Sequence, residues 1–255
     1  MYTPKAFAVR DLAGMQAEMQ RAGLATLVTL TGSGLVATHL PVMLEESQGE
    51  FGTISGHISR ANSQWMESLP DYDALMIFTG PDAYVSPGWY PSKQETGRVV
   101  PTWNYAAIHA YGRPAFFSDA ERLRDLVTRL TSKHEARFAL PWKPTDAPPV
   151  FLDAQLKAIV GFEMPIRRLE GKHKFNQNRS AEDRQGVIDG LKQTGESKDD
   201  EVATFMERLG IGDKSSIPSR ECRSFTGKRP FHQFPDCLAR IFALVQDFVH
   251  LIHDW

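Results

Sequence analysis

The sequence predicts a mainly β protein, an antiparallel barrel or sandwich with flanking helices. Between residues 24 and 117, apolar segments of strand length follow one another at short spacing. Turns rich in glycine and polar residues join them, whereas a parallel sheet would need long crossover connections. Short strands connected in this way are typical of antiparallel barrels and sandwiches. The chain has 255 residues, of which 42% are hydrophobic, enough to bury a substantial core.

The first predicted element is a helix over residues 12–22, "LAGMQAEMQRA". Asp11 stands where a side-chain oxygen can cap the first turn, and Gly23 is the residue type that commonly ends a helix. Apolar residues recur on one face of this segment, so we expect that face to pack against the sheet.

Strands follow this helix directly. Residues 24–30 and 35–44 flank "TGSG", which predicts a hairpin because glycine adopts the unusual backbone angles of tight turns. Residues 60–69 predict a short helix or turn within the series of strands. The predicted strands cover residues 24–30, 35–44, 49–59, 74–80, 83–90 and 99–117.

Helical patterns return after residue 117. Ser118 and Glu121 match a capping box, and apolar residues then recur at helical spacing, which predicts a helix over residues 118–138. A proline-rich connector follows at 141–149. We expect a helix passing into a strand at 150–162, an extended segment at 163–171 that returns to the barrel, and helices near 180–193 and 199–209.

Charge and cysteine content restrict the class of protein. Lys plus Arg number 29 against 31 Asp plus Glu, so no net positive field draws the chain to nucleic acid or anionic lipid. The opening segment carries Lys5 and Arg10 where a signal peptide needs an apolar run, and we expect a cytoplasmic protein. Only Cys222 and Cys237 occur; we interpret them as reduced thiols, and they are too few for a cysteine metal cluster.

One predicted strand, "VVPTWNYAAIHAYG" at residues 99–112, has unusual side chains. Alternation places Trp103, Tyr105, His109 and Tyr111 on one face, with small or polar residues such as Asn104 on the other. Aromatic walls could enclose a flat cofactor ring such as a flavin, and amides could pair with its edge. The alternative is that these residues simply form part of a barrel core.

A second group follows the predicted strand at residues 49–59. The stretch "SGHISRAN" contains His57, Ser59, Arg60 and Asn62. A strand end that leads into a helix offers cationic, hydroxyl and backbone N–H donors, the groups that bind phosphate. The alternative is a surface arginine beside a helix cap.

A third group lies in "EGKHKFNQNRSAEDRQGV", residues 170–187. Lys172, Gln177 and Arg179 are among its cationic and amide side chains, a set able to bind phosphate or another anion. The alternative is the solvated start of a helix.

Taken together, these stretches resemble a known family. The order "HLP", "GHISRAN", "FTGPDAYVSPGWY", "VVPTWNYAAIHAYG" and "IVGFEMPIRRLEGKHKFNQNRSAEDRQGVI" closely resembles the PaiB-type proteins, described as FMN-binding negative transcriptional regulators. The resemblance runs from Met1 to about Leu209. It implies an FMN-binding split β-barrel of the pyridoxamine-phosphate-oxidase-like type, antiparallel and Greek-key-like with flanking α-helices, working as a homodimer with FMN near the subunit interface.

The resemblance also implies which residues contact the cofactor. It makes four residues phosphate and ribityl contacts: His57, Ser59, Arg60 and Asn62. It places three residues at a flavin wall or dimer contact: Trp103, Asn104 and Tyr105. Three further residues match family positions without a defined role: Lys172, Gln177 and Arg179. No catalytic residue and no metal ligand is assigned.

The chain divides into three predicted regions. Residues 1–170 form the FMN-binding barrel, residues 171–209 a helical segment packed on it, and residues 210–255 an extension outside the family pattern. Apolar residues between Leu238 and Ile252 recur at helical spacing, which predicts one amphipathic helix, too interrupted by charge to cross a bilayer.

The implied function is that of an FMN-binding negative transcriptional regulator. Two alternatives remain: a flavin-dependent oxidoreductase of the split-barrel class, and a dimeric binding module without flavin. A DNA partner lacks support from a recognisable motif, because the sequence shows no convincing helix-turn-helix pair, no glycine turn between two amphipathic helices and no basic recognition helix.

Overall fold

The computed structural model describes residues 1–210 of the chain. Cys222, Cys237 and the amphipathic helix expected near the carboxyl end lie outside the described residues. Within residues 1–210, no helix is long and apolar enough to cross a membrane. In the same range, no three His, Cys, Asp or Glu side chains come together as metal ligands.

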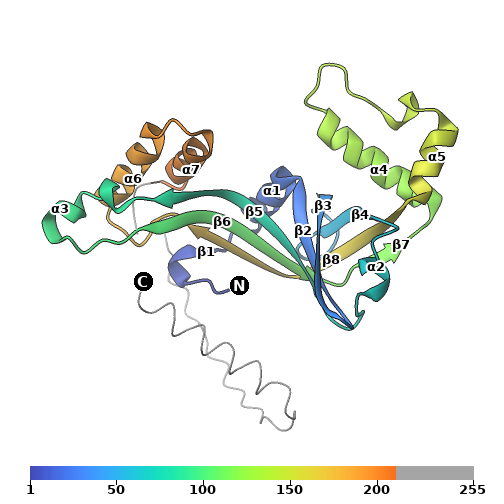
Figure 1. Ribbon diagram of the computed structural model, residues 1–255, viewed down its shortest axis with the longest axis horizontal. Coiled ribbons are helices and arrows are strands. Elements are labelled where there is room, and N and C mark those ends of the chain that lie inside the picture. The colour runs from blue at the N-terminus through green and yellow to red at the C-terminus, as the bar shows by residue number, and fades with distance from the viewer. Residues whose placement is uncertain (211–255) are drawn as a thin grey trace, which may run out of the picture. The chain divides into compact units, whose positions relative to one another are not determined.

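The main sheet is antiparallel and closes on itself (Figure 1). Neighbouring strands follow the order β8-β4-β3-β2-β5-β6, and β6 pairs in turn with β8, so these strands make a closed barrel. The mainly β fold class with flanking helices, predicted from the sequence, is confirmed. The barrel strands are β2 (Leu24–Thr31), β3 (Gly34–Glu45), β4 (Thr53–Ser59), β5 (Ala74–Val85), β6 (Thr102–Gly112) and β8 (Ile159–Lys174).

Strand β8 closes the barrel because it belongs to both halves of the sheet. Its first residue, Ile159, lies opposite Ser59 of β4, and its later residues pair with β6. The pairing with β6 shifts register between Tyr111 and Gly112. A Cβ atom at Gly112 would stand 2.3 Å from the Pro165 carbonyl oxygen, so this crossing needs glycine.

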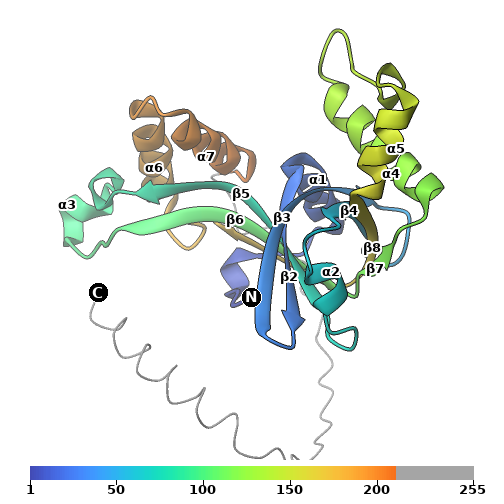
Figure 2. The same ribbon diagram turned by 45° about the vertical axis from the view of Figure 1, so that its right-hand side comes forward.

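Helices flank the barrel at both ends and along one side (Figures 1 and 2). Helices α6 and α7 lie on the same side of the long β5–β6 pair as α1, whereas α4 and α5 lie at the opposite end of β8. The helices are α1 (Leu12–Ala22), α2 (Gln64–Glu67), α3 (Ser92–Thr96), α4 (Ala120–Glu135), α5 (Pro149–Lys157), α6 (Ala181–Gln193) and α7 (Ser197–Arg208). The minor elements are η1 (Lys5–Phe7), β1 (Ala8–Val9), η2 (Pro87–Trp89), β7 (Ala115–Phe117) and η3 (Pro144–Asp146).

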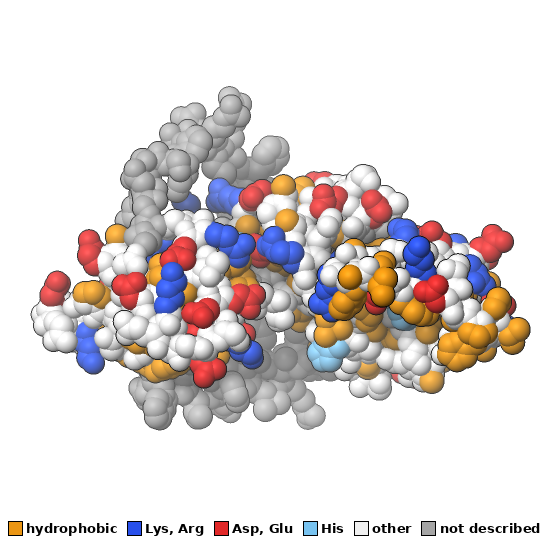
Figure 3. All heavy atoms as spheres, turned by 90° about the horizontal axis from the view of Figure 1, so that it is seen from above, with side chains coloured by type: hydrophobic (Ala, Val, Ile, Leu, Met, Phe, Trp, Pro, Cys, Tyr) orange, Lys and Arg blue, Asp and Glu red, His pale blue; other side chains and the backbone are white. Residues whose placement is uncertain are grey.

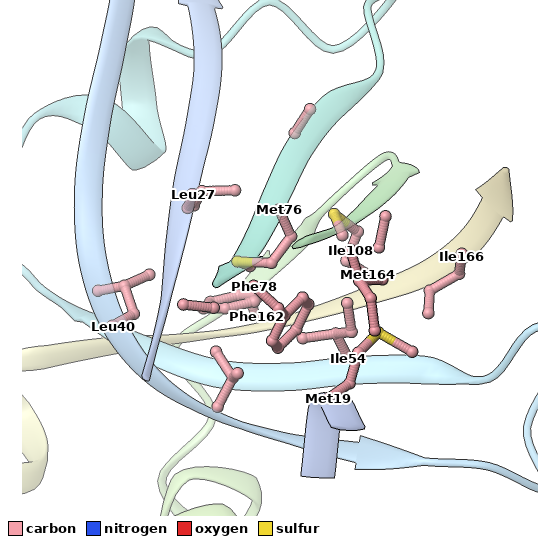
Figure 4. Packing of buried hydrophobic residues seen from close by; sticks show 14 of the residues in the cluster. Met19, Leu27, Leu40, Ile54, Met76, Phe78, Ile108, Phe162, Met164 and Ile166 are labelled. Atoms are coloured by element: carbon pink, nitrogen blue, oxygen red, sulfur yellow. The ribbon is translucent and has the colours of Figure 1, made fainter. Parts of the chain in front are cut away.

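Buried side chains form two hydrophobic clusters. The first fills the barrel and includes Leu27, Met76 and Phe162, whose side chains converge from different strands (Figure 4). The second lies where α6 and α7 cover the far ends of β5 and β6, and it includes Phe175 and Leu191. Burial of these apolar side chains is the main force that holds each region together.

Strand β5 differs from its prediction. The sequence predicts separate strands at 74–80 and 83–90, whereas the structure has one strand, β5, followed by the turn η2. The two apolar segments join through a β-bulge, because the pairing with β6 shifts between Thr79 and Asp82. Gly80 and Pro81 interrupt the apolar pattern at the bulge without ending the strand.

Two predicted helix caps also differ. Asp11 occupies the N-cap position of α1, but its side chain makes no capping hydrogen bond. Helix α4 begins later than the Ser118 capping box predicts, because the side chain of Asp119 accepts from the Arg122 amide. A carboxylate is a stronger acceptor than a hydroxyl at this end of the helix dipole. Ser118 instead accepts a hydrogen bond from Arg60.

The connection between α6 and α7 corrects another prediction. Gly195, with φ of 70°, lies in the short turn between these two helices, although the sequence pattern indicates no such glycine turn. Both helices bury an apolar face in the second cluster. Acidic residues outnumber basic ones in α7, "SKDDEVATFMER", so its charge is unfavourable for contact with a phosphate backbone.

Candidate functional site

Strand β4 brings the predicted phosphate-binding residues to one end of the barrel. Side chains alternate along it, so Ile58 enters the core while His57 and Ser59 face outward. The chain then turns, and the Arg60 amide donates to the Ala158 carbonyl oxygen at 2.8 Å. The predicted group therefore sits where β4, the end of α5 and the start of β8 meet.

His57 has a buried polar atom without a partner. Its Nδ1 atom forms no hydrogen bond within the described part of the chain. Burial lowers the pKa of His57 below its ordinary value, which favours the neutral ring. An unsatisfied nitrogen on a neutral imidazole is suited to exchange a hydrogen bond with a ligand.

Arg60 links β4 to the start of β8. Its Nε donates to the Lys157 carbonyl oxygen at 2.7 Å, and its Nη2 donates to the Ile159 carbonyl oxygen at 2.8 Å. Nη2 also lies 3.2 Å from the Ser118 hydroxyl. Nη1 makes no hydrogen bond with residues 1–210, so the fixed guanidinium keeps a free edge for an anion.

A cavity of about 540 Å³ lies beside Arg60. Apolar side chains from α4 and α5, including Leu156, line it together with Lys157. The one acidic group on its wall, Asp153, is paired with Arg124 at 2.5 Å. The charge left facing the cavity is therefore positive, which suits a phosphate attached to an apolar body.

The Asn62 side chain makes its hydrogen bonds within the fold. Its side-chain Nδ2 donates to the Thr38 hydroxyl at 2.9 Å, and its Oδ1 accepts from the Gln64 amide at 3.0 Å. These bonds fix the turn that follows β4. Asn62 therefore holds the turn that carries Arg60.

The predicted aromatic strand forms part of a continuous outer surface. Pairing of β3, β2, β5, β6 and β8 places outward-facing residues of all five strands side by side. We call this surface the aromatic face. Its members are Leu24, Leu35, Leu75, Ile77, Tyr84, Trp103, Tyr105, His109, Tyr111, Arg168, Glu170 and Lys172.

Large apolar side chains of the aromatic face remain accessible. Trp103 and Tyr84 are each 49% exposed and Leu35 is 76% exposed. Trp103 packs edge-on against Tyr84, with ring centroids 6.2 Å apart, and its Nε1 donates to Asp82 at 2.8 Å. An exposed apolar surface of this extent indicates an interaction surface.

Like His57, His109 at the centre of the aromatic face has one buried ring nitrogen without a hydrogen-bond partner. Its Nδ1 makes no hydrogen bond within residues 1–210. Burial lowers the pKa of His109, and the N-terminal amine and Arg168 add to this effect against the opposing charge of Glu170. A contact with a further molecule on this face could satisfy the nitrogen.

Lys172 is the buried cation of the aromatic face. Its ammonium lies 5.1 Å from the centre of the Tyr105 ring and donates to the Tyr2 carbonyl oxygen at 3.1 Å. It is only 8% exposed and has no acidic partner within residues 1–210. Lys172 is therefore a buried cation with no counter-ion in the described part of the chain.

Three of the predicted site residues lie away from both the turn after β4 and the aromatic face, in the contact between α6 and the sheet. Asn104 is fully buried and donates to Asn176 at 2.6 Å, which in turn donates to the Tyr90 hydroxyl at 2.9 Å. Gln177 bonds the backbone of its own turn, and Arg179 stacks over the Tyr90 ring at 4.9 Å. Each side chain supports the attachment of α6 to the sheet.

The predicted residues thus occupy three separate places in one chain. We call His57, Ser59, Arg60 and Asn62 the β4 group. This group meets β8 at its first residue, and Lys172 lies near the last. Along β8, the path from Ile159 to Lys172 is roughly 40 Å at about 3.3 Å per residue. Figures 1 and 2 place the two ends of β8 on opposite sides of the barrel.

Sequence reasoning missed two members of the candidate site. Ser118 matched a helix cap, and Lys157 lay in an unremarkable helical pattern. Lys157 reaches Arg60 because α5 ends beside the turn after β4, and Ser118 reaches it because β7 pairs with the start of β8. No local signal connects residues so far apart in the sequence.

Known proteins match most of the chain. Residues 1–168 match the family model described as "Putative FMN-binding domain". The protease synthase and sporulation protein PAI 2 of Bacillus subtilis is 31% identical over 207 residues, which cover 81% of this chain and 97% of that protein. An uncharacterized protein of Aspergillus fumigatus is 33% identical over 222 residues, covering 71% of this chain and 85% of that one.

A solved structure is similar at lower identity. The FAD and heme binding protein of Mycobacterium smegmatis is 14% identical, with a TM-score of 0.46, and the match covers 66% of this chain and 73% of that one.

Proposed function

The chain belongs to the PaiB-type family of FMN-binding domains, and from this we propose that it binds FMN between two copies of itself and acts through the flavin as a negative regulator of transcription. Bound FMN would supply the electron chemistry, and the chain would bind and orient it. One observation carries the proposal: His57 Nδ1 is buried without a partner beside the turn that fixes Arg60.

The β4 group supplies the phosphate end of the proposed site. Arg60 offers a fixed guanidinium edge, and Lys157 adds a second cation at the 540 Å³ cavity. Ser59 stands at the strand end beside them, and Asn62 holds the turn. A dianionic phosphate gains charge-assisted hydrogen bonds from such donors.

The flavin ring requires a wall that the β4 group does not provide. Tyr105, Trp103 and Lys172 on the aromatic face offer aromatic surface and a buried cation, but at the other end of β8. A single chain cannot bring both groups to one FMN molecule. We therefore place the ring between the β4 group of one copy and the aromatic face of a second copy.

Regulation in this proposal does not require DNA contact by residues 1–210. The helix pair α6–α7 has a glycine turn, yet α7 is acidic. Phosphate backbones attract Lys and Arg, so this helix is a poor candidate for a recognition helix. The flavin state would then act through the surface of the dimer, on a protein or a small ligand.

Absorbance spectroscopy tests the proposal. The purified full chain is mixed with FMN, excess flavin is removed, and the near-ultraviolet and visible spectrum is recorded. We expect retained flavin bands corresponding to one FMN per chain. A spectrum without flavin bands would overturn the proposal and leave a dimeric binding module without flavin as the better account.

A further inference from the structure

A second cavity, of about 420 Å³, lies between α1, α7 and the bulge of β5. It shares no lining residue with the cavity beside Arg60. We propose that it binds a small organic acid, a carboxylate joined to an apolar body, at a site separate from the flavin.

The cavity exists because the two hydrophobic clusters do not merge. Phe78 and Ile108 belong to the barrel cluster, whereas Phe205 of α7 belongs to the second cluster. The β5 bulge lies between them, and a Cβ atom on Gly80 would come within 2.8 Å of the Ala106 side chain. Glycine thus permits a bulge here, and bulges are over-represented beside binding sites.

The inner wall of the cavity is apolar and firmly held. Phe78, Ile108 and Phe205 are each at most 6% exposed. The Phe205 ring is stacked on Phe175 at 4.7 Å and meets His173 edge-on at 4.9 Å. An apolar or aromatic group of a ligand would find a preformed surface there.

Three basic side chains border the cavity. Arg21 comes from α1, and Lys198 and Arg208 come from α7. Figure 3 shows Lys and Arg side chains, interspersed with Asp and Glu, near the middle of the face that carries these helices. None of the three forms an ion pair within residues 1–210, although Lys192 nearby pairs with Glu207 at 2.6 Å. Their charge is therefore available to a ligand.

Two of the three acidic groups around the cavity are already engaged. Glu18 lies 3.0 Å from His173 Nε2, and Asp82 accepts from Trp103 Nε1 at 2.8 Å. Glu201 is the remaining carboxylate. Hydrogen bonds do not remove the charge of Glu18 and Asp82, but they hold these two carboxylates, so the charged groups free to contact a ligand are the three cations and Glu201. Arginine binds carboxylates in a fork, which favours an acid as the ligand.

Titration of the full chain saturated with FMN tests this proposal. The probe is 3-phenylpropionate, followed by calorimetry and by ligand-observed NMR, with 3-phenylpropan-1-ol as the uncharged analogue. We expect saturable binding of the acid and little binding of the alcohol. Arg208→Ala and Arg21→Ala should each weaken binding of the acid by about tenfold, because each removes a charge-assisted contact.

Two matched variants give the test its controls. Arg137→Ala removes an exposed arginine elsewhere and should leave the affinity unchanged. Glu201→Gln removes the opposing carboxylate and should strengthen binding. Absence of saturable binding, equal binding of the alcohol, or weaker binding by Glu201→Gln would overturn the proposal. Binding that occurs without FMN and is lost when FMN is added would also overturn it, because the cavity would then belong to the flavin site.

Discussion

Replacing Arg60 with alanine should lower the affinity for FMN by about tenfold or more, because a phosphate loses its charge-assisted donors. The guanidinium is held by the Lys157 and Ile159 carbonyl oxygens, so it is oriented before the ligand arrives. Such preorganisation keeps the entropic cost of binding low. Fluorescence quenching of FMN during titration measures the change.

Arg60→Ala also removes the hydrogen bonds that Arg60 makes within the fold. A second variant, Lys157→Ala, separates the loss of a phosphate contact from a loss of stability. Lys157→Ala removes the other cation at the cavity but leaves the carbonyl that Arg60 uses. It should weaken FMN binding while the thermal unfolding midpoint stays unchanged. Ser118→Ala should change FMN affinity little. Undiminished FMN affinity in folded Arg60→Ala and Lys157→Ala would contradict the phosphate assignment.

Replacing Ile77 with glutamate should convert the proposed dimer to monomers, with an increase in dimer dissociation constant of at least about a hundredfold. Ile77 lies in the middle of the aromatic face, between Thr26 of β2 and His109 of β6. A carboxylate there would be buried without a partner when a second copy docks. Sedimentation velocity over a range of concentrations measures the effect.

Leu140→Glu is the matched control for this prediction, since Leu140 lies between α4 and η3, is 92% exposed and lines neither the cavity beside Arg60 nor the aromatic face. It should remain dimeric. Retained flavin should fall together with dimer content in Ile77→Glu, because the proposed site needs both copies. Dimers of unchanged stability in Ile77→Glu would show that this face is not the interface.

Apolar segments of strand length between glycine-rich and polar turns allowed most of the fold to be predicted from the sequence. Strand β2 alternates strictly, and a turn around Gly34, with φ of 124°, connects it to β3. The bulge in β5 could not be predicted, because Gly80 and Pro81 resemble a turn between two strands. Only pairing with an unbroken β6 shows that the backbone continues.

The predicted site residues that the structure brings together are those that are neighbours in the sequence. His57, Ser59 and Arg60 share one strand end, as a local pattern indicated, and their contact with FMN stays a prediction. Asn104 was expected to contact the cofactor, yet it donates to Asn176 across a buried contact that no local pattern reveals. The distance between the β4 group and Lys172 follows from the path of β8, which pairing alone determines.

Mixing two variants that each bind little FMN tests most directly whether the flavin site is shared between two copies. Arg60→Ala removes the phosphate end, and Lys172→Ala removes the cation of the opposing face; each alone should retain little FMN. After subunit exchange, mixed dimers contain one intact site, so about a quarter of all sites should bind FMN again. Exchange without any recovery of binding, or full retention of FMN by Lys172→Ala alone, would contradict a flavin site built from two copies.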